Sequence, residues 1–189
     1  GTRSAEPFYD VPHHRIRAYG RWGSDTPKLH LFATGPWRAP GANVNVFARE
    51  SMIDTMAASA KADPLEFRLR NTSDPRMRGV LEAAAKAAGW KKGAGPTGRG
   101  AGIACGIDAG TYVALVAEVK VDPATGEVRV LRVVAAQDMG IVVNPDGARM
   151  QMEGCIAMGL GYALTEEGRF EGGKILTRSF GSYEIPRFS

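Results

Sequence analysis

Apolar residues recur along this chain with a helical period in its first half. Between residues 43 and 61 they return every three or four positions, which predicts an amphipathic helix. Residues 64–71 and 75–88 each follow an aspartate and begin with proline, a pair typical of a helix start. A fourth helix is expected from Pro145 to about Glu166. The stripe expected to face the core is Val44, Phe47, Met52, Ile53, Met56 and Ala60 in the first helix, and Met77, Val80, Leu81, Ala84, Ala85 and Ala88 in the third.

Valine-rich segments after residue 110 predict a long β-hairpin, with residues 111–122 and 128–136 joined by a turn that contains Pro123 and Gly126. The pattern predicts an α+β fold, in which antiparallel strand pairs pack against helices. Two regions are expected, residues 1–90 and 100–189, joined by a Gly-, Pro- and Lys-rich linker. Further short strands are expected at residues 15–22, 29–33, 174–178 and 182–185.

Composition narrows the function classes. The 189 residues are 44% hydrophobic, enough for a real core, and 24 basic residues nearly balance 20 acidic ones. No strongly basic stretch points to nucleic acid, and no run of 18 apolar residues suggests a membrane span. Because the chain lacks an initiating Met, we expect a piece of something longer. Cys105 and Cys155 have no close partner of the Cys-x-x-Cys kind, so we expect buried thiols in a reducing compartment and no iron–sulfur framework.

The segment from Gly35 to Gly41 contains two glycines and two prolines directly before the first long helix. Its backbone amides and the positive end of the helix would stabilise an anion or a polar cofactor edge, and Arg38 could bind an oxygen pair. The alternative is an ordinary rigid connection with Trp37 buried.

Four glycines, at 147, 154, 159 and 161, fall inside the helix expected after Pro145. Each costs about 1 kcal/mol relative to alanine in a helix interior, or about 4 kcal/mol together. Either another backbone packs closely on this helix or a bulky ligand lies across it. Gln151 would suit a cofactor's amide or oxygen edge, whereas Asp138 and Asn144 are expected to cap the helix or brace the loop before it.

These segments together resemble one family over essentially the whole chain. The matching stretches are Trp-Arg-Ala-Pro-Gly at 37–41, Phe-Ala-Arg-Glu-Ser-Met-Ile-Asp at 47–54, Asp-Pro-Leu-Glu-Phe-Arg-Leu-Arg-Asn at 63–71, Val-Ala-Glu-Val-Lys-Val-Asp at 116–122, Asp-Met-Gly-Ile-Val-Val-Asn-Pro at 138–145, Gln-Met-Glu-Gly at 151–154, Gly-Leu-Gly at 159–161 and Tyr-Glu-Ile-Pro at 183–186. They resemble the molybdopterin-binding large subunit of the xanthine dehydrogenase, aldehyde oxidase and isoquinoline 1-oxidoreductase family.

The resemblance implies a molybdopterin cofactor with molybdenum, as the cytosine dinucleotide in many bacteria. Family members insert a water-derived oxygen into a C–H bond, use a glutamate as base, and pass electrons to iron–sulfur clusters on a partner. It places the Arg38 loop beside the molybdenum and Gln151 with the Gly-rich helix on the pterin. No residue of this chain is expected to bind the metal directly. The expected cofactor-binding residues are Trp37, Arg38, Ala39, Gln151, Glu153 and Gly154.

Two family motifs are missing from the sequence. The catalytic glutamate of the family lies beyond the Tyr-x-Ile-Pro stretch, and the upstream Gly-rich cofactor motif is also absent. Glu153 matches a structural position, so we expect no catalytic residue here and activity only with partner chains, including an iron–sulfur subunit. Ala39 and Pro40 replace the purine-specific aromatic of the family, which favours an aldehyde or an N-heterocycle as substrate.

Two other function classes are open at this point. A noncatalytic scaffold of the same fold would cover its own apolar surface, whereas a piece of a larger enzyme would leave that surface exposed. A small basic binding module would need salt-sensitive binding to nucleic acid. We expect a cytoplasmic protein, with the bacterial periplasm as the alternative.

Overall fold

The computed structural model describes residues 3–17, 38–91 and 98–186. The chain forms two compact units, and the boundary that falls within the described residues lies between Gly140 and Ile141. The first unit holds three helices and a sheet, and the second holds one long helix and a short hairpin. Most of the expected linker at 91–99 lies outside the described residues, so the division of the subunit at that point stays a prediction.

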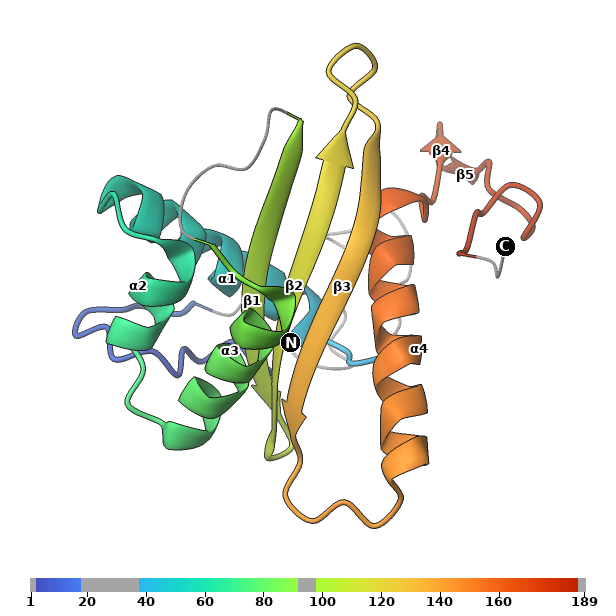
Figure 1. Ribbon diagram of the computed structural model, residues 1–189. Coiled ribbons are helices and arrows are strands. Elements are labelled where there is room, and N and C mark those ends of the chain that lie inside the picture. The colour runs from blue at the N-terminus through green and yellow to red at the C-terminus, as the bar shows by residue number, and fades with distance from the viewer. Residues whose placement is uncertain (1–2, 18–37, 92–97, 187–189) are drawn as a thin grey trace. The chain divides into compact units, whose positions relative to one another are not determined.

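A three-stranded antiparallel sheet forms the centre of the first unit (Figure 1), with strands in the order β1 (Arg99–Asp108), β2 (Thr111–Val121) and β3 (Val128–Asp138). The hairpin expected over β2 and β3 is confirmed, and Asp122 stabilises its turn by accepting a hydrogen bond from the Ala124 amide at 2.8 Å. Strand β1 was not expected, because its sequence is rich in glycine and alanine and lacks the β-branched residues typical of strands.

Helices α2 (Pro64–Arg70) and α3 (Pro75–Ala88) begin as the sequence predicts. The Asp63 and Asp74 side chains each accept two hydrogen bonds from amides of the first turn, which supplies acceptors for donors that the helix leaves unsatisfied. Gly89 ends α3 in the left-handed conformation, with φ of 70°.

The core of the first unit lies between α3 and one face of the sheet. All but one of the residues in the predicted α3 stripe are buried, and Met77, Leu81 and Ala84 are completely so. They pack against Ile103, Cys105, Ala114 and Val116, which alternate along β1 and β2 and therefore point to the same face.

Helix α1 (Ala42–Ser59) lies where the sequence predicts it, and its predicted stripe is only partly buried: Ile53 is in the core and Met56 packs against it, whereas the other members are exposed. Val44, Phe47 and Met52 are 70%, 74% and 59% exposed. The side that faces the core instead carries Glu50, Ile53 and Ala57. The hydrophobic pattern therefore placed the helix correctly but identified only part of its buried face.

The second unit consists of α4 (Pro145–Leu164) and a hairpin of β4 (Phe170–Glu171) and β5 (Lys174–Ile175). Gly172 and Gly173 join these strands with φ of 52° and 76°, which glycine adopts without strain. The chain then returns to the end of α4, where the Thr165 hydroxyl donates to the Glu184 carbonyl at 2.8 Å. None of the helices in the described ranges combines the length and apolar character that a membrane crossing needs.

Several short strands expected from the sequence are not found. Residues 182–185 form a turn and an extended segment without strand pairing, and pairing after residue 173 covers only Lys174–Ile175. Residues 15–17 form no strand, whereas residues 18–22 and the strand expected at 29–33 lie outside the described residues. Short exposed segments have few cross-strand partners, so local alternation is a weak guide there.

Candidate functional site

The loop before α1 presents an uncapped helix N-terminus. Gly41 is the N-cap residue, no side chain among the described residues accepts a hydrogen bond there, and the first turn contains no acidic residue. Ala39 adopts a left-handed conformation with φ of 69°, and its carbonyl accepts from the Ala42 amide at 2.8 Å. The partial positive charge of the helix end is therefore not neutralised by a cap or a nearby carboxylate of this turn.

Arg38 lies at this helix end, and its backbone carbonyl accepts a hydrogen bond from the Asn43 side chain at 3.2 Å. Its side chain is exposed, so the guanidinium adds positive charge to the surface. The predicted binding residue Trp37 lies outside the described residues. Whether its indole is buried therefore stays a prediction. We call the surface formed by Arg38, Ala39 and the first turn of α1 the Arg38 surface.

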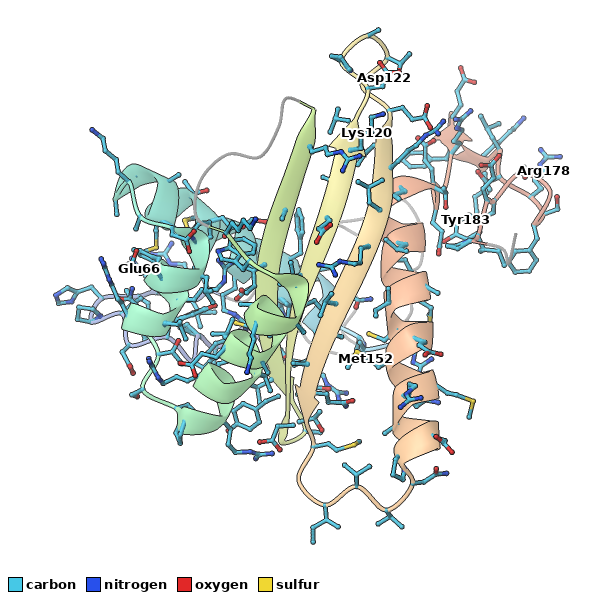
Figure 2. The ribbon with its side chains drawn as sticks, in the orientation of Figure 1. Glu66, Lys120, Asp122, Met152, Arg178 and Tyr183 are labelled. Atoms are coloured by element: carbon cyan, nitrogen blue, oxygen red, sulfur yellow. The ribbon has the colours of Figure 1, made fainter. Side chains whose placement is uncertain are left out.

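Helix α4 carries the second group of predicted residues, on a helix that presents both polar and apolar side chains (Figure 2, where Met152 is labelled). Gln151 and Glu153 are exposed, Gly154 is half-buried, and only Gly161 is buried in the whole helix. A helix this apolar with so little burial within the chain is typical of one that packs inside a larger structure.

The four glycines of α4 divide into two kinds. A side chain at Gly147 would meet the capping side chain of Asn144, and one at Gly161 would meet Glu166 and Pro186. At Gly154 and Gly159, by contrast, no heavy atom of the described residues lies within 4 Å of an added Cβ. Close packing within the unit explains the first pair, and it does not explain the second.

Asn144 and Asp138 behave as the sequence predicts. The Asn144 side chain caps α4 by accepting from the Gly147 amide at 3.0 Å, and Asp138 braces its loop by accepting from the Gly140 amide at 3.0 Å. Asp138 also binds Arg76 through both carboxylate oxygens, at 2.8 and 2.7 Å. The Arg76 bond is the main reason that the pKa of Asp138 falls to about 2.

A buried polar cluster around Glu50 joins α1, α2 and β1, and sequence reasoning missed it. The Glu50 carboxylate accepts from the Tyr9 hydroxyl at 3.1 Å, from Arg68 Nε at 3.0 Å and from the Cys105 amide at 3.1 Å. Arg68 is fully buried and also donates to Asp54 at 2.7 Å. The formal charges of Arg49, Glu50, Asp54 and Arg68 sum to zero, so the cluster is neutral as a whole.

The Glu50 cluster covers the edge of β1. The Cys105 amide donates to Glu50, and the Cys105 carbonyl accepts from Arg49 at 3.2 Å, so both backbone groups that face away from β2 are satisfied by α1. Burial, followed by the nearby Glu50 carboxylate, raises the pKa of the Cys105 thiol to about 12. Cys105 is buried as expected, whereas Cys155 is exposed, which corrects the prediction for that residue.

A signal for the Glu50 cluster was present in the sequence. Glu50, Ile53 and Ala57 are spaced by three and four residues, which puts a carboxylate on the same helix face as two small or apolar side chains. An acid in such a position needs a buried partner. Arg68, on the short helix that follows, is that partner.

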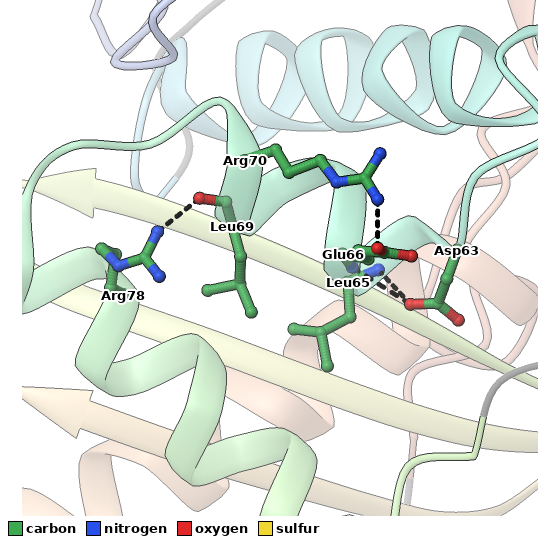
Figure 3. A pocket seen from close by; sticks show the side chains of 6 residues that line it. All are labelled: Asp63, Leu65, Glu66, Leu69, Arg70 and Arg78. Carbon is green, nitrogen blue, oxygen red and sulfur yellow. Dashed lines mark hydrogen bonds and ion pairs between the residues drawn. The ribbon is translucent and has the colours of Figure 1, made fainter.

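A shallow pocket of about 470 Å³ lies between α2 and α3 (Figure 3). Leu65 and Leu69 supply its apolar wall, Arg70 is paired with Glu66, and Arg78 donates to the Leu69 carbonyl. Its arginines are thus engaged by neighbouring groups, and neither the Arg38 surface nor α4 contributes a lining residue. We assign no function to this pocket.

Comparison with known proteins shows the family of the chain. Residues 43–189 match the family model for the molybdopterin cofactor-binding domain. The chain belongs to this family. It is 35% identical over its whole length to a nicotinate dehydrogenase subunit from Pseudomonas putida, and 36% identical over 96% of its length to the beta subunit of isoquinoline 1-oxidoreductase from Brevundimonas diminuta. It is also 31% identical over 98% of its length to the aldehyde oxidoreductase molybdenum-binding subunit PaoC from Escherichia coli.

This member of the molybdopterin cofactor-binding family spans only a small part of those relatives. It covers 17% of the Pseudomonas subunit, 23% of the Brevundimonas subunit and 25% of the Escherichia subunit. The family match includes α4 and nearly all of α1, and the Pseudomonas match also includes the Arg38 loop. The α+β fold expected from the sequence is the arrangement found in this family member.

Proposed function

We propose that this chain is one part of the cofactor-binding subunit of a molybdenum hydroxylase that oxidises an aldehyde or an N-heterocycle. The observation that carries the proposal is the match to the molybdopterin cofactor-binding domain over residues 43–189. The relatives named above are a nicotinate dehydrogenase, an isoquinoline oxidoreductase and an aldehyde oxidoreductase, which favours these substrate classes. When bound, the molybdenum cofactor supplies the redox and oxygen-transfer chemistry.

The Arg38 surface fits a polar, anionic group. An uncapped helix N-terminus with no acidic residue in its first turn stabilises negative charge, and the exposed guanidinium of Arg38 adds to it. The small side chain of Ala39, held at φ of 69°, leaves the loop backbone accessible. In this proposal Arg38 orients oxygen atoms of the cofactor, and the α1 amides stabilise their charge.

The face of α4 around Gly154 fits a flat organic group. The space beyond Gly154 is open among the described residues, so a ligand can approach the helix backbone there. The Gln151 side chain offers both a donor and an acceptor one turn before Gly154, which suits an amide-like edge of the pterin. Gln151, Glu153 and Gly154 would thus bind and orient the cofactor without touching the metal.

The general base and the iron–sulfur clusters are proposed to come from other parts of the enzyme. Glu153 is exposed on α4, and the family resemblance implies a structural position for it instead of that of the catalytic glutamate. Ile141 and Val143 are each 92% exposed, and Met150 is 65% exposed. A self-sufficient scaffold would cover such side chains, so their exposure favours a piece of a larger assembly over that alternative.

The proposal is tested by purifying the chain with its natural partners and measuring the metal by mass spectrometry. We expect about one molybdenum atom per assembly, together with release of a pterin and, for the dinucleotide form, cytidine monophosphate after acid hydrolysis. The substitution Arg38→Ala should lower cofactor content, whereas Arg129→Ala, at an exposed arginine on β3, should leave it unchanged. An active assembly without molybdenum would refute the proposal, and a stable, inactive assembly without cofactor would favour the scaffold alternative.

A further inference from the structure

The outer face of α1 carries one charged residue, Asp54, at its border, and the Asp54 carboxylate is paired with Arg68 at 2.7 Å. Its exposed residues follow one another at intervals of three, four or one, so they lie side by side on the helix surface. Three of them, Val44, Phe47 and Met52, are large, apolar and more than half exposed. We call this surface the α1 face, and it consists of Val44, Phe47, Ala48, Ser51, Met52, Thr55, Ala58 and Ser59.

Two of the three charged residues of α1 turn away from this face, and the third is paired at its border. Arg49 and Glu50 belong to the buried cluster, and Asp54 at the border of the face is held by Arg68 at 2.7 Å. A helix at a water-facing surface has the opposite arrangement, with charges outside and apolar residues inside. Helix α1 therefore has the character of a helix that is packed on both sides.

Two of the three hydroxyl groups on the α1 face are already satisfied within the helix. The Thr55 hydroxyl donates to the Ser51 carbonyl at 2.9 Å, and the Ser59 hydroxyl donates to the Thr55 carbonyl at 2.9 Å. A polar group that keeps its hydrogen bond loses little when water is removed. The face can thus be buried against an apolar surface without leaving these hydroxyls unsatisfied.

The size of the α1 face distinguishes between two occupants. An 18-residue helix is about 27 Å long, and a strip about 10 Å wide along it amounts to about 270 Å². A stable dimer needs about 800 Å² from each partner, so this face alone is too small to join two copies of the chain. It is large enough as one contact within an extensive domain interface.

We infer that the α1 face packs against an uncharged, apolar helix or strand from the part of a family subunit that this chain does not cover. The chain matches only 17% to 25% of its relatives, so most of such a subunit is left to supply that element. The inference rests on the proposed function and names which surface joins the chain to the rest of the enzyme. Because α1 also carries the Arg38 surface at its N-terminus, this contact would fix that surface in the assembly.

The test places a photoreactive phenylalanine analogue at position 47 in the complex purified from its natural host. The matched control carries the same analogue at position 86, where an exposed lysine lies on α3. We expect a cross-link from position 47 to a segment that itself matches the molybdopterin-binding subunit family, at least tenfold above the control. Cross-links to a second copy of this chain, to an unrelated protein or to nothing would each overturn the inference.

A charge substitution gives an independent measurement. Phe47→Glu should reduce recovery of the complex at least tenfold, whereas Lys86→Glu should not. The melting temperature of the chain by itself should change by less than about 2 °C for either variant, because both side chains are exposed. The molybdenum content of the same complex distinguishes the two proposals. A complex that contains molybdenum but shows no cross-link from position 47 to the family segment refutes the proposed interface and leaves the proposed function standing.

Discussion

Removing the Arg68 guanidinium should be among the most destabilising single changes in the first unit. Arg68→Met keeps a long side chain but deletes one of the two arginines that pair with Glu50, whose carboxylate remains buried with 6% of its side chain exposed. Removing one partner of a buried ion pair typically costs about 3–5 kcal/mol. Arg49 still pairs with Glu50 at 3.2 Å, so we expect a loss near the lower end of that range. Arg68 also donates to Asp54 at 2.7 Å, but that carboxylate is half exposed and water can replace the lost bond.

The assay is urea unfolding of the 189-residue chain, followed by circular dichroism and by tryptophan fluorescence. Arg70→Met is the matched control, since Arg70 lies on the same helix and pairs with Glu66 at the surface, with 65% of its own side chain exposed. We expect the control to lose no more than about 1 kcal/mol. The double variant Glu50→Gln with Arg68→Met should lose less than the sum of its single variants, since the amide that replaces the Glu50 carboxylate carries no charge that needs Arg68. A loss for Arg68→Met no larger than that of Arg70→Met would refute the reasoning.

Three further predictions concern single side chains. Arg76 holds the pKa of Asp138 at about 2, below its ordinary value of 3.8, so this pair contributes stability above pH 4 that is lost as the pH falls toward 2. Asp138→Asn should therefore make the stability of the protein depend less on pH in that window. An unchanged acid unfolding curve would contradict the pairing. Iodoacetamide at pH 8 should label the exposed Cys155 and spare Cys105, whose pKa is raised to about 12 by burial, and two labels per folded chain in mass spectra would count against this. Gly154→Ala should stabilise α4 by about 1 kcal/mol, whereas Gly161→Ala should destabilise the helix because the added methyl group meets Glu166 and Pro186. Thermal unfolding measures both effects. Equal effects would show that the two glycines do not differ in packing.

The sequence predicted most helices because their start signals are local. Asp63, Asp74 and Asn144 each stand before a proline and each caps its helix in the structure. The rotation of α1 was not predictable in the same way, since Phe47 and Ile53 are equally apolar and only tertiary contacts decide which one is buried. Strand β1 was missed because its glycines and alanines acquire their extended form from pairing with β2.

The candidate site shows the same division. Sequence reasoning named the Arg38 loop and the Gly-rich helix from their glycines, prolines and family resemblance, and their roles in cofactor binding stay predictions. The Glu50 cluster was missed because it joins residues 41 and 55 positions away in the chain, Tyr9 and Cys105, through hydrogen bonds that no local pattern encodes.

The position of Glu50 in the chain has a consequence for how the protein is made. On the ribosome, Tyr9 and α1 emerge first, Arg68 follows 18 residues after Glu50, and the Cys105 amide arrives only 55 residues after it. Until that strand emerges, the inner side of the helix has no sheet edge to cover, and the Glu50 carboxylate has only Tyr9, Arg49, Arg68 or water as partners. A nascent chain whose synthesis stops before residue 105 therefore lacks the last hydrogen-bond partner of Glu50. Its incompletely covered helix is the kind of surface that chaperones bind.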